Sequence, residues 1–180
     1  MTQEQNIPSK AELIEGLRSS EQRLLDKLRA LPESAFEQGR YENGWNARQI
    51  LAHVASIEWT YPRLIDIARQ ASAPSDPPAS SPQPPAPPKP DSLPTRTAQG
   101  GILSYNDRQV EKRADASVAD LISEFQKNRA VTIAAVEEAD DSLFTTHIKS
   151  AGGITGALAT VIQGIAILHV IGHTNDIVGE

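Results

Sequence analysis

The chain of 180 residues contains no cysteine. Its absence excludes disulfides, thiolate zinc sites, iron–sulfur clusters and a cysteine nucleophile. Aromatic residues are also scarce, at 4% of the sequence, and this low share favours packed helices over a β-sandwich or barrel. A chain of this length can bury a core without a covalent cross-link, so we expect a single domain over residues 1–180.

Positive charge is scarce too. Seventeen Lys and Arg residues stand against 23 Asp and Glu residues, which gives a net charge of −6. Binding to nucleic acid requires a cationic surface that contacts phosphates, so we expect a small-molecule substrate and no nucleic acid. The N-terminal residues MTQEQNIPSK lack the apolar core of a secretory signal. We therefore expect a cytoplasmic protein.

Proline is concentrated in one segment. Ten of the 13 prolines lie between Pro74 and Pro94. Proline has no amide hydrogen and a fixed φ, so this segment can form neither a helix nor a central strand. We predict an extended, flexible Pro-rich connector over residues 73–95. The alternative is a ligand for a proline-binding domain.

Apolar residues elsewhere recur with helical spacing. The pattern predicts helices over residues 9–31, from 46 onward, from 117 onward and over 154–177. Ser9, Asn46 and Ser117 stand at N-cap positions, and Pro62 is expected to kink the second helix or to restart it as a shorter piece. A short helical turn is expected over residues 104–113. No segment alternates long enough to predict a strand.

The predicted fold class is therefore all-α. A four-helix bundle is the economical way to bury four amphipathic helices. The Pro-rich connector lies between the second and third helices, and it allows these two to be antiparallel neighbours or to sit diagonally.

The fourth helix is unusually apolar. Residues 154–172 carry no charge and approach the length of about 20 residues that spans a bilayer. Gln163, His169 and the lack of aromatic or basic anchors argue against a membrane helix. A helix that is apolar all round can also be buried on two sides, by its own bundle and by a second subunit. We therefore expect a homodimer, with membrane attachment as the less favoured alternative.

Three histidines have a distinctive placement. His169 and His173 are four residues apart, so their side chains lie on one face of the fourth helix. His53 lies among apolar residues on the inward face of the second helix. If the two helices face each other, three imidazoles converge and can hold a divalent ion with an open coordination position. The competing interpretation is that they are core histidines bonded to backbone carbonyls. His147 is expected to be exposed.

Polar and aromatic residues near these histidines are candidates for the rest of a site. Asp176 follows His173 by three residues and could orient a metal ligand or act on a bound water as a catalytic base. Gln49 and Ser56 flank His53 on the same helix face, and we predict that they border the same cavity.

Three further residues complete these predictions. Trp45 and Tyr105 are candidate pocket walls, although aromatic side chains in a core need no functional role. Glu58 is expected to point away from the cavity, toward solvent or into a salt bridge.

Two segments resemble the DinB/YfiT-like superfamily. They are GWNARQILAHVASIEW, residues 44–59, and LHVIGHTNDIV, residues 168–178. Proteins of this superfamily carry a Trp, a polar N-cap and one His on the second helix, followed by HxxxH on the fourth. Residues 105–125 are also similar to the stretch that leads into the third helix of the family.

The resemblance implies a four-helix bundle, often dimeric, with a metal ion held by three histidines. The matching positions here are His53, His169 and His173. The family includes S-transferases that use bacillithiol, mycothiol or glutathione, isomerases that act on thiol adducts, and many uncharacterised metal-dependent hydrolases. The ion can be zinc, nickel or another divalent metal. The Pro-rich connector is longer than expected for the family. This difference affects the prediction of how the mouth of the pocket is covered, and it does not affect the set of metal ligands.

Two classes of function follow. The first is a metal-dependent enzyme that activates a low-molecular-weight thiol or a water molecule. A thiol cosubstrate would suit a chain without cysteine, and Arg48, Arg63 and Arg108 are possible contacts for its carboxylates. The second is a non-catalytic dimeric bundle that binds a ligand or has a structural role, with its histidines as packing residues.

Overall fold

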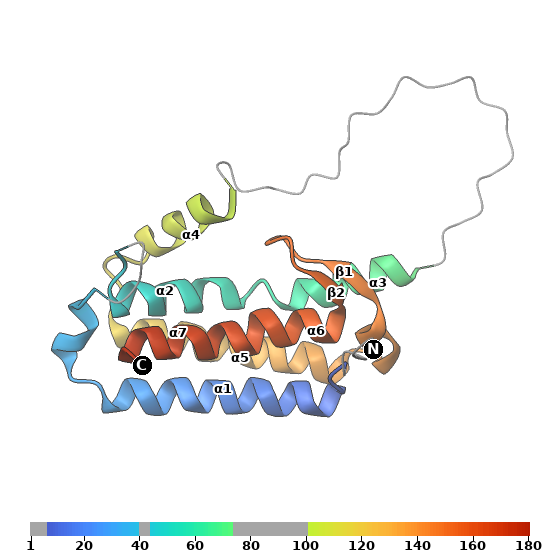
Figure 1. Ribbon diagram of the computed structural model, residues 1–180, viewed down its shortest axis with the longest axis horizontal. Helices are drawn as coiled ribbons and strands as arrows, with labels where there is room; N and C mark the ends of the chain where they lie inside the picture. The colour runs from blue at the N-terminus through green and yellow to red at the C-terminus, as the bar shows by residue number, and fades with distance from the viewer. Residues whose placement is uncertain (1–6, 40–43, 74–100) are drawn as a thin grey trace, which may run out of the picture.

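The computed structural model describes residues 7–39, 44–73 and 101–180 (Figure 1). The predicted Pro-rich connector, apart from Ala73, lies outside the described residues. The described residues are mostly helical, which confirms the all-α fold class.

Three of the helices begin with the same local device. Helix α1 (Lys10–Ala30), helix α2 (Ala47–Glu58) and helix α5 (Val118–Glu138) each start with a capping box. Ser9, Asn46 and Ser117 accept a hydrogen bond from a backbone N–H of the first turn, and a side chain three residues on accepts from the backbone N–H of the cap. These bonds satisfy amides that have no partner inside the helix. The N-caps predicted from the sequence are confirmed.

Proline restarts the chain after α2. Helix α3 (Pro62–Ser72) begins with Pro62 in its first turn, where the missing N–H of proline costs nothing. Helix α4 (Gly101–Glu111) begins three residues earlier and ends two residues earlier than the helical turn that the sequence predicts over 104–113. Two short 3-10 helices, η1 (Glu33–Glu37) and η2 (Asp141–Thr145), follow α1 and α5.

The C-terminal part of the chain departs from the prediction. Strands β1 (His147–Lys149) and β2 (Thr155–Ala157) form an antiparallel hairpin. The expectation of no strand is therefore wrong, and so is the predicted start of the last helix at residue 154. Three residues in each strand are too few to show a period-two pattern.

The last helix is built from three consecutive segments. Helix α6 (Leu158–Ile162) leads into a π-helical turn, η3 (Gln163–Leu168), and then into helix α7 (His169–Val178). A π-turn holds one more residue per hydrogen-bonded ring than an α-helix, and such turns are frequent at functional sites. Here the π-turn ends directly before His169.

Helices α1, α2, α5 and the composite helix α6–η3–α7 form the bundle (Figure 1). Helices α1 and α2 occupy opposite corners, and each contacts α5 and α7. Helices α2 and α5 are neighbours that run in the same direction, because α4 returns the chain to the end at which α2 begins. The sequence allowed an antiparallel or a diagonal pair, so both alternatives are wrong.

The core consists of two clusters of buried apolar side chains. Burial of one Leu, Ile or Phe side chain contributes about 1.5–3 kcal/mol, and fully buried residues of these types come from every helix of the bundle: Leu13, Leu17, Leu24, Ile50, Leu51, Leu121, Phe125, Leu158, Ile162 and Ile177. Helix α1 comes close to the π-turn at Gly16, where a Cβ atom would lie 2.7 Å from Cδ1 of Ile167. A larger residue would force Ile167 to move.

The composite helix is long and apolar enough to cross a membrane, by length and composition alone. Over Leu158–Val178 the mean hydropathy reaches 1.2, and 44% of the most apolar window is buried. The central helix of a bundle meets the same criterion, and here α1 and α2 pack against this helix.

Candidate metal centre

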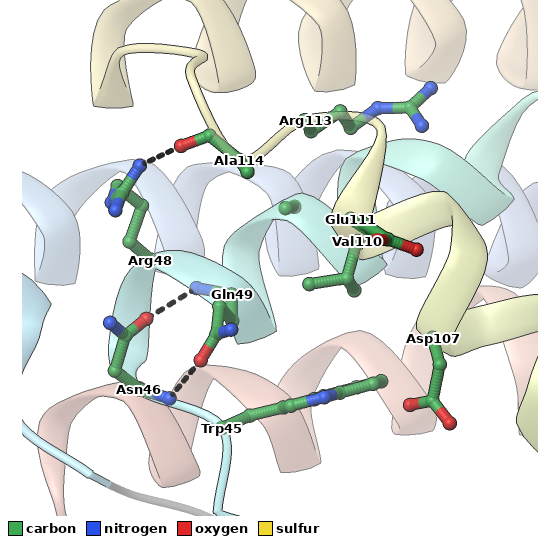
Figure 2. A pocket seen from close by; sticks show the side chains of 10 residues that line it. Trp45, Asn46, Arg48, Gln49, Asp107, Val110, Glu111, Arg113 and Ala114 are labelled. Carbon is green, nitrogen blue, oxygen red and sulfur yellow. Dashed lines mark hydrogen bonds between the residues drawn. The ribbon is translucent and has the colours of Figure 1, made fainter.

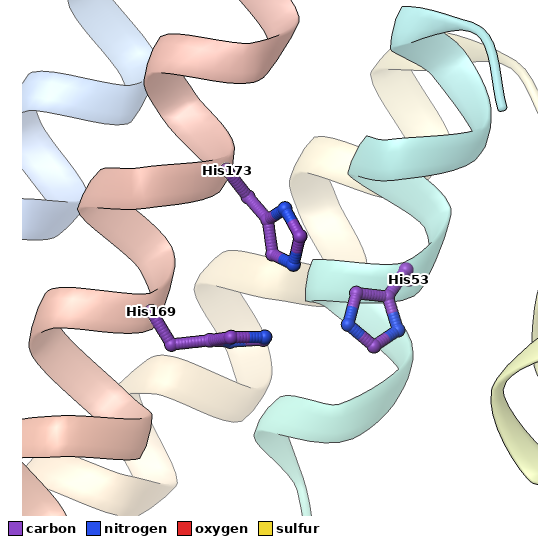
Figure 3. A group of neighbouring side chains, drawn as sticks. All are labelled: His53, His169 and His173. Carbon is purple, nitrogen blue, oxygen red and sulfur yellow. The ribbon is translucent and has the colours of Figure 1, made fainter. Parts of the chain in front are cut away.

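Three imidazoles converge from two facing helices. His53 lies in the middle of α2, and His169 and His173 occupy successive turns of α7 (Figure 3). One nitrogen from each ring can be chosen so that the three atoms lie within 4.8 Å of one another. The ring centroid of His53 lies 5.4 Å from that of His169 and 5.1 Å from that of His173, and the latter two are 4.4 Å apart.

The cluster is largely withdrawn from solvent. His53 is 4% exposed and His173 is 7% exposed, while His169 is half-buried. Burial, together with the neighbouring His173 and His169, lowers the pKa of His53 to about 3. Burial and the proximity of His173 lower the pKa of His169 to about 4. Both rings are therefore neutral at pH 7 and keep a lone pair for a metal ion.

The hydrogen bonds of these rings distinguish between a metal site and a packed core. The Nδ1 atoms of His53 and His169 are buried and have no hydrogen-bond partner among the described residues. A core histidine is expected to bond a backbone group, because a buried polar atom without a partner costs free energy. Unsatisfied nitrogens on two of three adjacent imidazoles fit a site that holds a divalent ion better than a packed core.

Asp176 contacts the histidine cluster through a hydrogen bond to His173. Its Oδ2 atom lies 2.9 Å from Nδ1 of His173. The carboxylate accepts a hydrogen bond from Nδ1–H of His173, and in this tautomer the lone pair of the ring lies on Nε2. The structure thus places Asp176 against the imidazole of His173, outside the lining of the cavity.

The imidazoles line a cavity of about 140 Å³. Trp45 forms one wall, and its ring centroid lies 5.3 Å from that of His53. The other wall comes from α4, which contributes Leu103, Asn106 and Asp107. Oδ1 of Asn106 is buried without a hydrogen-bond partner, whereas Asp107 is exposed. These α4 residues could not be identified from the sequence, where only the neighbouring aromatic residue Tyr105 pointed to this segment.

A second cavity of about 260 Å³ adjoins the first and shares Trp45 and Asp107 with it (Figure 2). It lies between the first turns of α2 and the C-terminal half of α4. Gln49 lines this second cavity, and its Oε1 accepts a hydrogen bond from the backbone N–H of Asn46 at 2.9 Å. Arg48 lines it too, and its guanidinium donates to Glu37 at 2.9 Å and to the carbonyl of Ala114 at 2.6 Å.

Other predicted residues lie away from both cavities. The Ser56 hydroxyl is buried and donates to the carbonyl of His53 at 2.8 Å. Ser56 and the half-buried Tyr105 are absent from the lining of either cavity among the described residues. The guanidinium of Arg63 stacks 4.4 Å from the ring centre of Trp59. His147 is exposed on β1, as predicted.

The prediction for Glu58 is only partly right. It is fully buried and forms an ion pair with Arg129. The expected alternative of a salt bridge is therefore right, and that of a solvent-facing side chain is wrong. The partner lies on another helix, so spacing along α2 could not identify it.

The fold and the site define a helical bundle in which three converging imidazoles beside a cavity could hold a metal ion. A family model described as the DinB superfamily matches residues 16–176. The chain belongs to the DinB superfamily, which confirms the resemblance seen in the sequence. No curated protein and no solved structure matches the chain.

Proposed function

We propose that the protein is a divalent-metal-dependent enzyme acting on a small molecule, with His53, His169 and His173 as the metal ligands. The observation that carries this proposal is the convergence of three imidazoles in the wall of a cavity. Three protein ligands leave a coordination position open, which is typical of a catalytic rather than a structural zinc site. Zinc and nickel are the ions that we favour.

The bound ion would supply a Lewis acid that lowers the pKa of a thiol or water in the open position. The residues of the chain complete the site around it. Asp176 holds the ring of His173, and Trp45 limits the cavity on the side of α2. Asp107 offers a carboxylate within the same cavity, and we assign to it the acceptance of the proton that the nucleophile releases.

Transfer of a low-molecular-weight thiol is the reaction that we favour. The two adjoining cavities suit a two-substrate reaction, in which the thiol occupies the histidine cavity and the electrophile the larger one. The protein has no cysteine of its own, so the sulfur nucleophile would come from the cosubstrate. Arg48 and Arg63 are already engaged with other groups of the protein, so we do not propose them as the anchors of that cosubstrate.

Hydrolysis is the second candidate. It needs only water in the open position and a base that faces the cavity. Asp107 meets the second requirement, whereas Asp176 is engaged with His173. In either reaction we expect a cytoplasmic homodimer. A non-catalytic dimeric bundle remains the alternative to an enzyme.

A conjugation assay tests the proposal. The zinc- or nickel-loaded protein is incubated with glutathione, bacillithiol or mycothiol and the electrophile monochlorobimane, and the fluorescent conjugate is followed. We expect conjugation above the uncatalysed rate, abolished in His53→Ala and retained in His147→Ala. Hydrolysis of ester or amide substrates without thiol would favour the second candidate. Absence of both activities from the metal-loaded protein would favour the non-catalytic bundle.

A further inference from the structure

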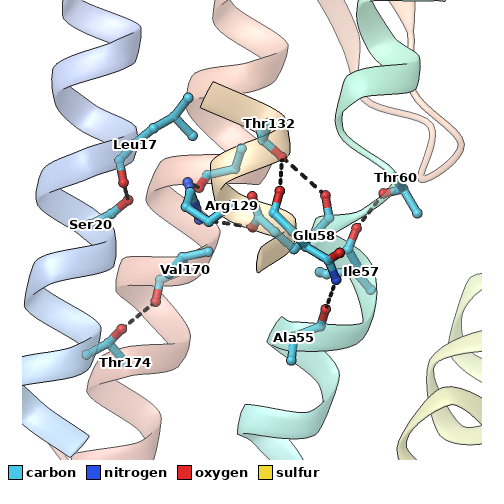
Figure 4. A network of polar contacts seen from close by, with 12 residues as sticks. Leu17, Ser20, Ala55, Ile57, Glu58, Thr60, Arg129, Thr132, Val170 and Thr174 are labelled. Carbon is cyan, nitrogen blue, oxygen red and sulfur yellow. Dashed lines mark hydrogen bonds and ion pairs between the residues drawn. The ribbon is translucent and has the colours of Figure 1, made fainter. Parts of the chain in front are cut away.

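The bundle contains a buried ion pair that the proposed mechanism does not use. Arg129 on α5 and Glu58 at the end of α2 are each 0% exposed, and Nη2 of Arg129 lies 3.0 Å from Oε2 of Glu58 (Figure 4). Transfer of two charges from water to a protein interior is expensive. The pair is also incompletely satisfied, because Nε of Arg129 and Oε1 of Glu58 have no hydrogen-bond partner among the described residues. Stability alone is therefore a poor reason for its presence.

The second contact of Arg129 is with the π-turn. Its Nη1 atom donates to the carbonyl oxygen of Ala166 at 2.9 Å. Ala166 lies inside η3, three residues before His169. Where a helix changes from α to π hydrogen bonding, carbonyls lose their regular partners, and inserted side chains can satisfy them. Arg129 gives the carbonyl of Ala166 such a donor in a place that water does not reach.

Glu58, the acidic partner in the ion pair, lies on α2, the helix that also carries His53. Glu58 follows His53 by five residues on α2, and further contacts tie the same part of α2 to α5. Thr132 donates to the backbone carbonyl of Glu58 and Asn128 to that of Ala55, both at 3.4 Å. Helix α5 therefore holds α2 through Glu58 and the π-turn through Ala166, with one guanidinium between them.

We propose that Arg129 is a positioning residue for the metal centre. By bonding both the π-turn carbonyl of Ala166 and the carboxylate of Glu58, Arg129 keeps His169 facing His53. This inference rests on the proposed metal site. Helix geometry explains why the π-turn decides where His169 and His173 point. Each residue of an α-helix rotates the chain by about 100° around the helix axis. If the π-turn changed to regular α-helical hydrogen bonding, its extra residue would be taken into the α-helix, and α7 would rotate by about this angle relative to α6. His169 and His173 would then turn away from His53.

The test replaces the ion pair without leaving a buried charge. In Glu58→Met/Arg129→Met, both charges are removed together and the apolar volume is largely kept, a change that is often neutral for stability. The donor to Ala166 is lost. We expect the far-UV circular dichroism to be unchanged, Co²⁺ affinity measured by chelator competition to fall at least 10-fold, and the visible spectrum of bound Co²⁺ to change.

Two further variants separate positioning from general stability. Leu13→Ala removes a fully buried side chain of α1 and should lower stability while Co²⁺ affinity of the folded protein stays at the wild-type value. Arg129→Lys keeps a cation beside Glu58 but replaces the planar guanidinium, which bonds Glu58 and Ala166 at once, by a single ammonium group. We therefore expect an affinity between those of wild type and the double variant. If the double variant does not fold, Arg129→Lys alone is used to test the positioning role.

The outcomes distinguish this inference from the proposed function. Wild-type Co²⁺ affinity and spectrum in the double variant, or in Arg129→Lys if only that variant folds, would overturn the positioning role and leave the metal site intact. A wild-type protein that binds no Co²⁺ would overturn the metal site itself, and the positioning role with it.

Discussion

The carboxylate of Asp176 lies 2.9 Å from Nδ1 of His173, one helical turn away on α7. The side chain of His173 is 8% exposed and that of Asp176 is 34% exposed. The carboxylate thus lies between the buried histidine cluster and solvent, where it holds the ring of His173 without lining the cavity. Carboxylates that hold a metal-binding histidine in this way also raise its basicity.

The first prediction concerns this contact. Asp176→Ala should weaken zinc or nickel binding about 10- to 100-fold, because His173 loses the partner that fixes its tautomer. Isothermal titration of the metal-free protein measures the affinity, and circular dichroism checks the fold. Asp115→Ala, which removes an exposed carboxylate before α5, is the control. Unchanged affinity in Asp176→Ala would show that the carboxylate has no role in ligand orientation.

The second prediction concerns Asp107. Asp107→Asn should reduce turnover by a factor of about 100 or more, the range typical of a lost general base, while metal affinity stays the same. The measurement is kcat of the metal-loaded protein in the conjugation or hydrolysis assay. Glu111→Gln changes a carboxylate of the larger cavity only and should keep most of the activity. Full turnover in Asp107→Asn would exclude it as the base.

The third prediction follows from the imidazole pKa values in the metal-free protein. The folded-state pKa values of about 3 for His53 and about 4 for His169 lie below the ordinary value of 6.5. Below pH 6.5 the unfolded chain therefore binds more protons than the folded one, and stability must fall as pH falls. The two rings together contribute a loss of the order of 3 kcal/mol between pH 7 and pH 5.

Urea unfolding at pH 7, 6 and 5 measures this loss. Burial raises the pKa of Glu58 to about 7, and this group acts in the opposite direction. The comparison is therefore with His53→Gln/His169→Gln, which keeps Glu58 and the acidic groups near the cluster, Asp107 and Asp176. The double variant should lose less stability on acidification than the wild type. Equal losses would mean that the imidazoles are not held neutral by their surroundings.

Much of the fold could be predicted from local signals. The capping residues Ser9, Asn46 and Ser117 mark helix starts because they bond amides within one turn. Pro62 marks a helix boundary because of its own ring. The pairing of His169 with His173 follows from helical spacing, and the facing position of His53 from the apolar face on which it lies.

Other features depend on contacts between distant segments. The β1–β2 hairpin has three residues in each strand, too few for a recognisable pattern. The π-turn η3 depends partly on a side chain of α5, since Arg129 bonds the carbonyl of Ala166. Asp107 reaches the histidine cavity only because α4 packs beside α2. Such relations are set by tertiary packing, and single-sequence periodicity cannot describe them.

Elemental analysis of bound metal is the most direct test of the three-histidine site. Untagged wild type is measured beside His53→Ala and His147→Ala after incubation with zinc or nickel and removal of free ions. We expect about one divalent ion per chain in wild type and in His147→Ala, whose altered residue is exposed on β1. We expect almost none in His53→Ala. A wild type without metal, or a His53→Ala variant that retains it, would contradict the three-histidine site.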